Sequence, residues 1–256
     1  MSYNIRYSGA SKDTGDRAWE VRRPATLAMI ADIKPDVFGV QEAKADQVQY
    51  LKENCQGYDL VGVGRKDGIS GGEHMLVCWN TSTVEKLDWG TFWLSDTPDE
   101  PSYTWGTETP RSTTWAKMKH LKTGRTFFFI CTHLHHKFND QDPQKKSLAL
   151  IISKMAELNP EGLPVILTGD FNINPDHYAL EDLDKVMRSA RTYSIYETDH
   201  NITFNDWSET PETYEIIDYV YYKGMAGSLR FKRITKPYEG FQFISDHYPV
   251  VAELIF

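Results

Sequence analysis

The segment LPVILTGDFNINP, residues 163–175, constrains the fold of this chain more than any other stretch. Its apolar run, 165–167, is bounded by Pro164 and Gly169. An apolar run of this length between proline and glycine is typical of a buried strand. We therefore expect a strand here whose C-terminal end surfaces and presents polar side chains to a crevice.

Asp170 and Asn172 follow the end of this strand. If the chain stays extended there, the two side chains point the same way, because side chains alternate between the faces of a strand. A carboxylate beside a carboxamide suits a site that handles a hydroxylic nucleophile or a phosphate. The alternative is a loop in which both side chains only form hydrogen bonds with the backbone of a turn. The other segments of the chain distinguish between these two interpretations.

The composition limits the partners of the protein. At 256 residues the chain is long enough for a large core, and we expect a single domain over 1–256. A formal charge of −8 and a pI near 5.5 argue against a protein that coats long nucleic acid, because such binding needs many lysine and arginine contacts to phosphate. A locally basic or metal-bearing cleft is compatible with both values.

The cysteines and the hydropathy indicate the cellular compartment in which the protein is expected to reside. Cys55, Cys78 and Cys131 are scattered, and the last two lie inside apolar runs, so we expect buried thiols in a reducing environment. No apolar run approaches the roughly 18–20 residues of a membrane span, and no basic-then-apolar leader precedes Met1. We expect a soluble, cytoplasmic protein, with the loss of an upstream leader left open.

Helical and strand-like patterns alternate along the chain. Helical spacing predicts helices over 21–33, 45–54, 143–158 and 176–187. Shorter apolar or alternating runs predict strands at 1–7, 37–40, 58–64, 75–79, 84–94, 112–119, 127–131, 165–167, 216–222 and 248–256. This mixture predicts two packed sheets with helices outside, which makes four layers.

Three connecting segments carry their own expectations. The glycine-rich turn 68–72 is followed by no helix, so we interpret it as a hairpin connection rather than a phosphate-cradling loop. The polar and aromatic segment 95–110 is long for a compact domain and suggests a functional rim. Asp142, before Pro143, is expected to cap the helix that follows.

Polar residues recur where apolar runs begin or end. They are Asn4, Gln41-Glu42, Thr132-His133, Asp170 with Asn172, Asp218, and Ser245-Asp246-His247. Strand ends that converge at one edge of a sandwich would gather them into one pocket. This inventory of carboxylates, histidines and asparagines, with no activated serine or cysteine, fits a hard divalent ion held by oxygen ligands and chemistry on phosphate.

The ordered series SYNIRY, VQE, TPRSTTWAKM, CTHLHH, GDFNINP, IDYVYY and SDHYPVV resembles the endonuclease/exonuclease/phosphatase superfamily. The similarity spans the chain from Asn4 to His247 in the order of the family. It implies the DNase I-like fold, a four-layer α/β/β/α sandwich of two mixed sheets. It also implies a phosphoric ester hydrolase that depends on Mg²⁺ or Mn²⁺.

The resemblance also implies the roles of individual residues. Glu42 is the main metal ligand, with Asn4 close to the metal or to a phosphate oxygen and Asp246 in support. Asp170 orients or deprotonates the attacking water, and Asn172 holds that water or a phosphate oxygen.

Four further residues are expected to act on the phosphate. His247 binds the scissile phosphate and is oriented by Asp218 through its other ring nitrogen. His133 stabilises the developing charge or assists the leaving group, and Arg111 is a substrate-phosphate contact. The Asp218–His247 pairing favours imidazolium near neutral pH, which suits a residue that faces phosphate.

The expected function is that of a phosphodiesterase or nuclease-type enzyme, with a nucleotide, a short nucleic acid or a small phosphorylated molecule as substrate. The alternative is a phosphomonoesterase of the same fold, acting on a sugar or inositol phosphate. Two less favoured readings are a catalytically silent module that binds a phosphorylated ligand, and a zinc hydrolase of metallo-β-lactamase type that would use His133, His135 and His136. The last class resembles H-x-H-x-D-H, and here the Asp-His pair is missing.

Overall fold

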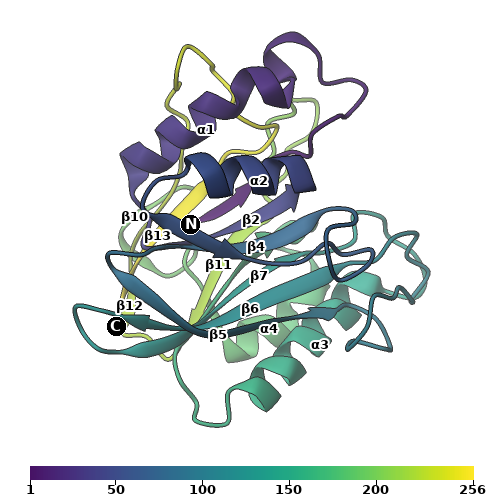
Figure 1. Ribbon diagram of the computed structural model, residues 1–256. Coiled ribbons are helices and arrows are strands. Elements are labelled where there is room, and N and C mark those ends of the chain that lie inside the picture. Colours follow the sequence, from purple (N-terminus) through teal and green to yellow (C-terminus); the bar gives the residue numbers. More distant parts are fainter.

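The computed structural model describes all residues from Met1 to Phe256. Two β-sheets pack face to face, and helices cover the outer face of each (Figure 1). This is the α/β/β/α sandwich expected from the sequence. No helix is long and apolar enough to cross a bilayer.

The first sheet contains both the first and the last strand of the chain. Its strands, in spatial order, are β10 (Ser194–Thr198), β12 (Gly227–Arg233), β13 (Val250–Ile255), β1 (Ser2–Asn4), β2 (Val37–Ala43), β4 (His74–Asn80) and β3 (Tyr58–Val61). β1 pairs parallel with β2 and antiparallel with β13. The last strand of the chain therefore lies inside the sheet rather than at its edge.

The second sheet is built around the segment 163–175. Its order is β5 (Val84–Trp93), β6 (Ser112–His120), β7 (Thr126–His133), β8 (Val165–Asp170), β11 (Asp218–Lys223) and β9 (Arg188–Ser189). β8 pairs parallel with β7 and antiparallel with β11. The expected buried strand is thus central.

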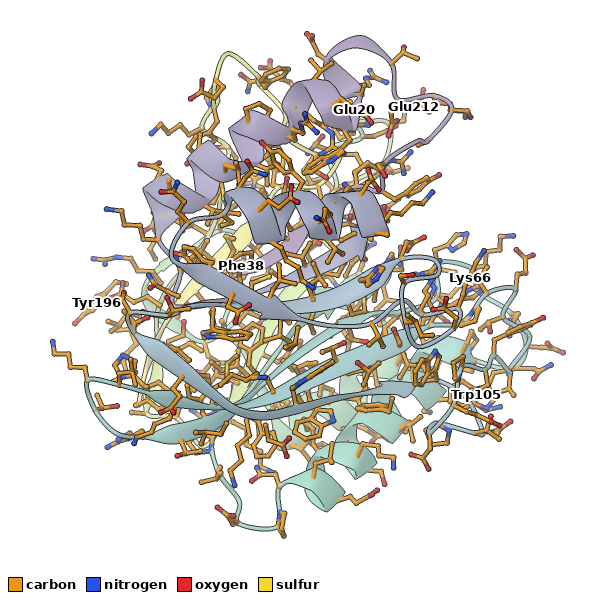
Figure 2. All side chains as sticks on the ribbon, in the orientation of Figure 1. Glu20, Phe38, Lys66, Trp105, Tyr196 and Glu212 are labelled. Atoms are coloured by element: carbon orange, nitrogen blue, oxygen red, sulfur yellow. The ribbon has the colours of Figure 1, made fainter.

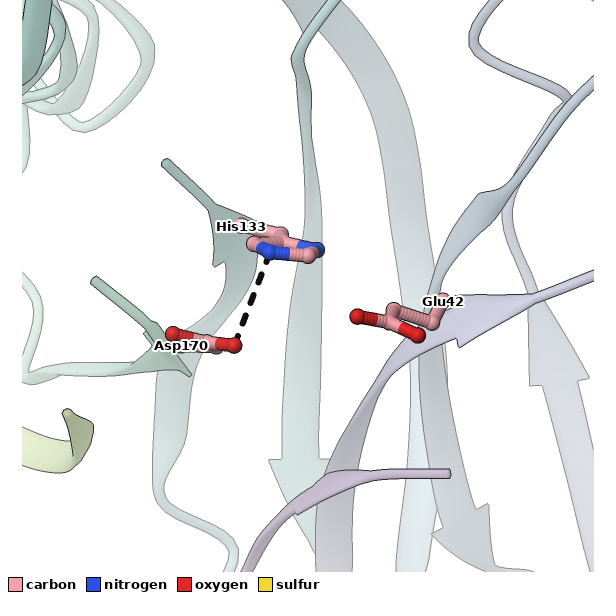
Figure 3. A group of neighbouring side chains, drawn as sticks. All are labelled: Glu42, His133 and Asp170. Carbon is pink, nitrogen blue, oxygen red and sulfur yellow. Dashed lines mark ion pairs between the residues drawn. The ribbon is translucent and has the colours of Figure 1, made fainter. Parts of the chain in front are cut away.

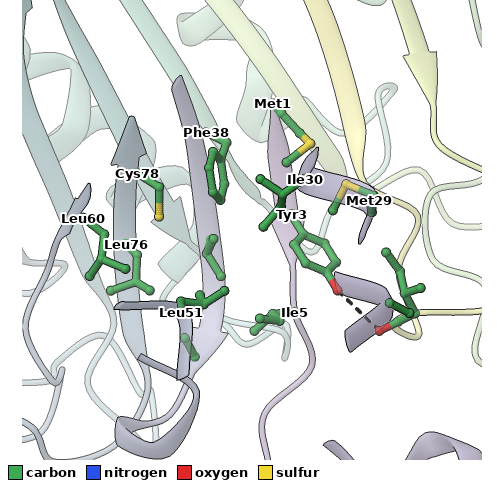
Figure 4. Close-up of a cluster of buried hydrophobic side chains, with 14 of the residues drawn as sticks. Met1, Tyr3, Ile5, Met29, Ile30, Phe38, Leu51, Leu60, Leu76 and Cys78 are labelled. Carbon is green, nitrogen blue, oxygen red and sulfur yellow. Dashed lines mark hydrogen bonds between the residues drawn. The ribbon is translucent and has the colours of Figure 1, made fainter. Parts of the chain in front are cut away.

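The helices bury their apolar faces on the two sheets. They are α1 (Trp19–Ile33) and α2 (Ala45–Asn54) on the first sheet, and α3 (Pro143–Leu158) and α4 (Glu181–Val186) on the second, with short 3₁₀ turns at Gly15–Arg17 and Tyr178–Leu180. In Figure 4, Met29 and Ile30 of α1 and Leu51 of α2 lie over Tyr3 and Phe38 of the sheet. Leu148 and Ile151 of α3 do the same over β7 and β8.

A third apolar cluster fills the space between the sheets. Its members come from β2, β4, β5, β6 and β7 and include Met75, Val77, Met118, Phe129 and Cys131. Cys78 and Cys131 are buried free thiols, as expected from their apolar surroundings. The two sheets are therefore held together by an apolar interface, and polar groups gather where this interface ends.

Some local expectations were wrong. The helix expected over 176–187 is a 3₁₀ turn followed by the short α4. Asp142 does not cap α3 through its side chain, because its backbone is left-handed at φ 53°. β9, β10 and β12 were not predicted. The sequence of β12, GSLRFKR, mixes charged and small residues and shows no continuous apolar run.

The glycine turn 68–72 does connect the antiparallel strands β3 and β4, as expected. The segment 95–110 forms an irregular loop after β5. Figure 2 shows Lys66, in the β3–β4 connection, and Trp105, in this loop, on the same side of the molecule. The end of β5, which leads into this loop, contacts the β3–β4 connection directly: the indole N–H of Trp93 donates to the carbonyl oxygen of Arg65 at 2.6 Å.

Candidate active site

Strand register brings the predicted polar residues to one end of the two sheets. Asn4 ends β1 opposite Gln41, so it lies beside Glu42 of β2. In the other sheet, Asp170 at the end of β8 is the register partner of both His133 of β7 and Asp218 of β11. The sheet order therefore determines which side chains can meet here.

Asn4 links the two sheets across this end. Its side-chain amide donates to Glu42 Oε1 at 3.1 Å and to Asp170 Oδ2 at 2.9 Å, and it lies 3.4 Å from His247 Nε2. Figure 3 shows Glu42 on one side and Asp170 with His133 on the other. Asn4 is fully buried, so these contacts hold the carboxylates at a fixed separation.

Glu42 reaches the site from a strained backbone. Its φ is 68°, in the left-handed region, and the β2–β4 register shifts between Val40 and Ala43. A bulge of this kind turns a side chain away from the regular alternation of the strand. Left-handed backbone costs energy for a residue with a Cβ atom and is common where function requires it. The backbone N–H of Tyr7 donates to Glu42 Oε2 at 3.1 Å and fixes the carboxylate.

Asn172 holds Asp170 in a way that the sequence did not predict. The chain is not extended at Asn172, where φ is 53°. The backbone N–H of Asn172 donates to Asp170 Oδ1 at 3.0 Å, and its side-chain amide donates to the carbonyl oxygen of Leu134 at 3.1 Å. The two side chains therefore do not project in parallel, and the turn orients the carboxylate.

His247 is paired with a buried carboxylate. Its Nδ1 lies 2.8 Å from Asp218 Oδ2, and its Nε2 lies 3.7 Å from Asp170 Oδ2. Burial alone would lower the pKa of His247, but the charges of Asp218 and Asp170 outweigh it and raise that pKa well above the usual value. The ring is therefore an imidazolium at neutral pH.

His133 is in the opposite state. Its Nε2 lies 3.5 Å from Asp170 Oδ2, and its Nδ1 lies 4.0 Å from Glu73 Oε2. Burial lowers the pKa of His133 well below its usual value, and the positive charges of Arg111 and Arg65 lower it further. A neutral and a charged imidazole thus flank the same carboxylate.

Asp246 lies at the edge of the site and faces a cation of the chain itself. Its Oδ2 is 3.3 Å from an amino nitrogen of Arg6, and the hydroxyl of Ser245 donates to its Oδ1 at 3.2 Å. Burial raises the pKa of Asp246, and the charge of Glu42 also acts to raise it. The expected support of a metal by Asp246 remains a prediction.

Arg65 and Glu73 are site residues that sequence reasoning missed. They flank the glycine turn, and their backbones are paired by the N–H of Arg65 and the carbonyl of Glu73 at 3.0 Å. A guanidinium nitrogen of Arg65 lies 2.8 Å from Glu73 Oε1. The one signal was an arginine and a glutamate at the base of a hairpin that enters the sheet next to Glu42. Arg111, which was predicted, is buried and lies 3.2 Å from His136 Nδ1.

The donor set fits a hard divalent cation. Ligand atoms of Glu42, His133 and Asp170 lie within 4.8 Å of one another, as do those of Asp170, Asp218 and His247. Burial raises the pKa of Asp170 to about 7, and the charges of Asp218 and Glu42 act in the same direction. A cation among these oxygens would offset that cost. His135 and His136, which the zinc alternative would use, belong to neither group.

Comparison with known proteins agrees with this geometry. The sequence model of the Endonuclease/Exonuclease/phosphatase family matches residues 1–247. The mannosyl-6-phosphatase of Bacteroides thetaiotaomicron is 33% identical, with a TM-score of 0.93 over 100% of this chain and 98% of that one. An endonuclease/exonuclease/phosphatase family protein of the same species is 34% identical, with a TM-score of 0.91 over 99% of this chain and 95% of that one.

A more distant structure shares the fold. The D. rerio protein TDP2, in complex with a single-strand DNA product, has a TM-score of 0.74 at 18% identity over 97% of this chain and 95% of that one. Its sequence is too different to indicate more than the architecture. On the strength of the family match over residues 1–247 and of full-length relatives above 30% identity, the chain is a member of the Endonuclease/Exonuclease/phosphatase family.

Proposed function

We propose that the protein hydrolyses phosphate esters with the help of Mg²⁺ or Mn²⁺. The observation that supports this most is the environment of Asp170, which is held by Asn4 and Asn172 between a neutral and a charged histidine. Glu42 would be the main ligand of the cation, and the amide of Asn4, which donates to both carboxylates, would hold Glu42 and Asp170 in place. When bound, the cation would neutralise charge on the phosphoryl oxygens.

The side chains of the site divide the remaining work. Asp170 would orient the attacking water and accept its proton as the oxygen–phosphorus bond forms and the ester bond breaks. His247, kept as an imidazolium by Asp218, would donate to a non-bridging oxygen of the phosphate. His133 lies on the other side of Asp170 and would stabilise the leaving oxygen.

The substrate is a phosphorylated small molecule or a short nucleic acid in this proposal, because a net charge of −8 disfavours a long duplex. The motif resemblance supports a phosphodiester as the first candidate in this proposal. The second candidate, a phosphomonoesterase, is supported by the full-length similarity to a mannosyl-6-phosphatase at 33% identity.

A metal-supplemented substrate screen tests the proposal. Purified protein would be assayed with bis-p-nitrophenyl phosphate, p-nitrophenyl phosphate, sugar and inositol phosphates, nucleotides and oligonucleotides. We expect turnover that stops with EDTA and returns with Mg²⁺ or Mn²⁺. Rescue by zinc alone would contradict the assigned metal, and binding without turnover of any ester would indicate a silent binding module.

Asp170→Asn is the variant that tests the role of the carboxylate. It keeps the size of the side chain and removes the proton acceptor, so we expect kcat/KM to fall by about 10³-fold or more. Thermal unfolding of the variant shows whether the fold is kept. Turnover near the wild-type rate in a folded variant would refute the role.

A further inference from the structure

The segment 203–205 lies beside the Asp218–His247 pair, although none of its residues was predicted as part of the site. It belongs to the irregular stretch between β10 and β11, and one of its residues forms an isolated bridge with His247. Thr203 and Asn205 are fully buried. Buried polar side chains of native proteins have hydrogen-bond partners, so the partners of these two residues indicate their role.

The hydroxyl group of Thr203 holds the backbone that carries Asp218. Its oxygen accepts hydrogen bonds from the backbone N–H groups of Ile217, at 2.9 Å, and of Asp218, at 3.0 Å. The carboxylate of Asp218 has one hydrogen-bond partner, His247, and its Oδ1 is buried without any. No other side chain orients this carboxylate by a hydrogen bond, so its direction depends on where the backbone is held.

The main chain of the same segment holds the backbone on both sides of His247. The carbonyl oxygen of Thr203 accepts from the N–H of Tyr248 at 2.7 Å. The N–H of Asn205 donates to the carbonyl oxygen of Asp246 at 2.7 Å. Thr203 therefore joins the two segments that carry the Asp218–His247 pair, through its side chain on one side and its carbonyl group on the other.

The ring of Phe204 lies against the imidazole of His247. The two ring centroids are 5.0 Å apart, and the ring planes meet at 65°. An edge-to-face contact of this kind favours one orientation of the imidazole. The position of the backbone thus also determines where His247 Nε2 points.

We propose that Thr203 is a positioning residue of the site. Its hydroxyl and carbonyl groups set the separation of the backbone segments that carry Asp218 and His247, so that the 2.8 Å contact between the two side chains directs His247 Nε2 toward Asp170. The proposal rests on the proposed phosphoesterase function and adds to it a residue that acts through other side chains. A shift of about 1 Å in a reacting group can cost on the order of 10²-fold in rate.

Substitutions at Thr203 test this role through turnover of p-nitrophenyl phosphate or bis-p-nitrophenyl phosphate in Mg²⁺. Thr203→Val keeps the shape of the side chain and removes the acceptor of two N–H groups, so we expect kcat/KM to fall by about 10²-fold. Thr203→Ser keeps the hydroxyl and should stay within about fivefold of the wild type. Thr203→Cys keeps only a weak acceptor and should lose about tenfold, and it takes the place of Thr203→Val if that variant does not fold.

Thr26→Val is the control for a general loss of stability. Thr26 is also fully buried, and its hydroxyl contacts that of Tyr3 at 3.0 Å, away from the Asp218–His247 pair. We expect this variant to lower the melting temperature while kcat/KM changes less than about threefold.

A spectroscopic measurement reports on the pair without any need for turnover. The Nδ1 proton of His247, identified by its loss in His247→Gln, gives a downfield proton NMR signal when it is hydrogen-bonded to Asp218. We expect this signal in the wild type, Thr203→Ser and Thr26→Val, and a shifted or absent signal in folded Thr203→Val.

The two proposals fail in different ways. A wild type that hydrolyses no ester would overturn the phosphoesterase function, and the NMR signal would still decide the role of Thr203. An unchanged signal in the folded valine or cysteine variant would overturn that role and leave the function intact. Wild-type turnover in the same variant, or equal losses of turnover in Thr203→Val and Thr26→Val, would do the same.

Discussion

The two histidines of the site differ because of what each one faces. His247 faces Asp218 and Asp170 and keeps its proton, whereas His133 is buried near two arginines and loses it. The same side chain therefore provides a cationic donor on one side of Asp170 and a neutral ring on the other. A difference of environment, not of residue type, separates the two roles.

Glu42 offers the sharpest test of the cation site. In Glu42→Gln the carboxylate is lost with little change of shape, so we expect the affinity for Mg²⁺ or Mn²⁺ to fall at least about tenfold by calorimetry. Glu161→Gln, at an exposed ion pair with Lys117, is the control and should bind as the wild type does. Unchanged affinity in Glu42→Gln would remove this residue from the ligand set.

For single residues, the sequence identified most of those that the fold brings together at the site. Glu42, Asp170 and His247 could be found because each lies next to an apolar run, and strand ends meet at one edge of a sheet. Arg65 and Glu73 could not, because their importance depends on the depth to which a hairpin is buried. The bend at Asn172 was missed because left-handed backbone is not encoded by alternation.

Among the elements, α1 holds the loops that carry the site. Arg22 of α1 is fully buried, and its guanidinium donates to the carbonyl oxygens of Ile5 and Ile244 at 2.8 Å each. It also donates to the carbonyl of Arg6 at 2.8 Å. These loops follow Asn4 and precede Asp246, so one side chain ties together the two ends of the chain at the site.

Arg22→Met should therefore destabilise the protein by about 3–5 kcal/mol, because the buried side chain loses its hydrogen bonds to four carbonyl oxygens. The free energy of unfolding from urea titration measures this loss. Arg23→Met is the matched control, since Arg23 is only half-buried and stacks over Tyr50. We expect it to cost less than about 1 kcal/mol. Equal effects in both variants would contradict the role of Arg22.

The periodicity of the sequence predicted the type of most helices and strands, but not the residues at which they begin and end. The apolar stripe of α3 and the buried runs of β2 and β8 were readable because burial imposes a period. The stripe expected in α1 was only partly right, since Val21 is exposed and the buried face includes Arg22 and Thr26. β12 was not, since only one of its faces packs inward and its outward residues are charged. The helix expected over 176–187 was cut short because tertiary packing, rather than helical propensity, determines the backbone after Pro175.

For the whole molecule, the buried carboxyl group of Asp170 predicts that the free energy of unfolding depends on pH. The folded-state pKa of Asp170 is about 7, against 3.8 for the free group. The folded state therefore binds more protons than the unfolded state between these values. This contribution to stability is present below pH 4 and is lost as the pH rises through 7.

We expect the metal-free wild type to lose stability relative to Asp170→Asn as the pH rises from 5 to 8, by a few kcal/mol at most. Urea titrations of both proteins in EDTA measure this difference. Addition of Mg²⁺ should restore the wild type more at pH 8 than at pH 5, because the carboxylates that would hold it are then ionised. A difference that is constant with pH would contradict the assignment of the buried proton.

The position of β13 between β12 and β1 means that both ends of the chain contribute to the site, so the site is completed late in translation. Asn4 leaves the ribosome early, but His247 follows only after every other strand that borders the pocket has been made. A nascent chain that lacks His247 therefore has an incomplete group of side chains around Asp170.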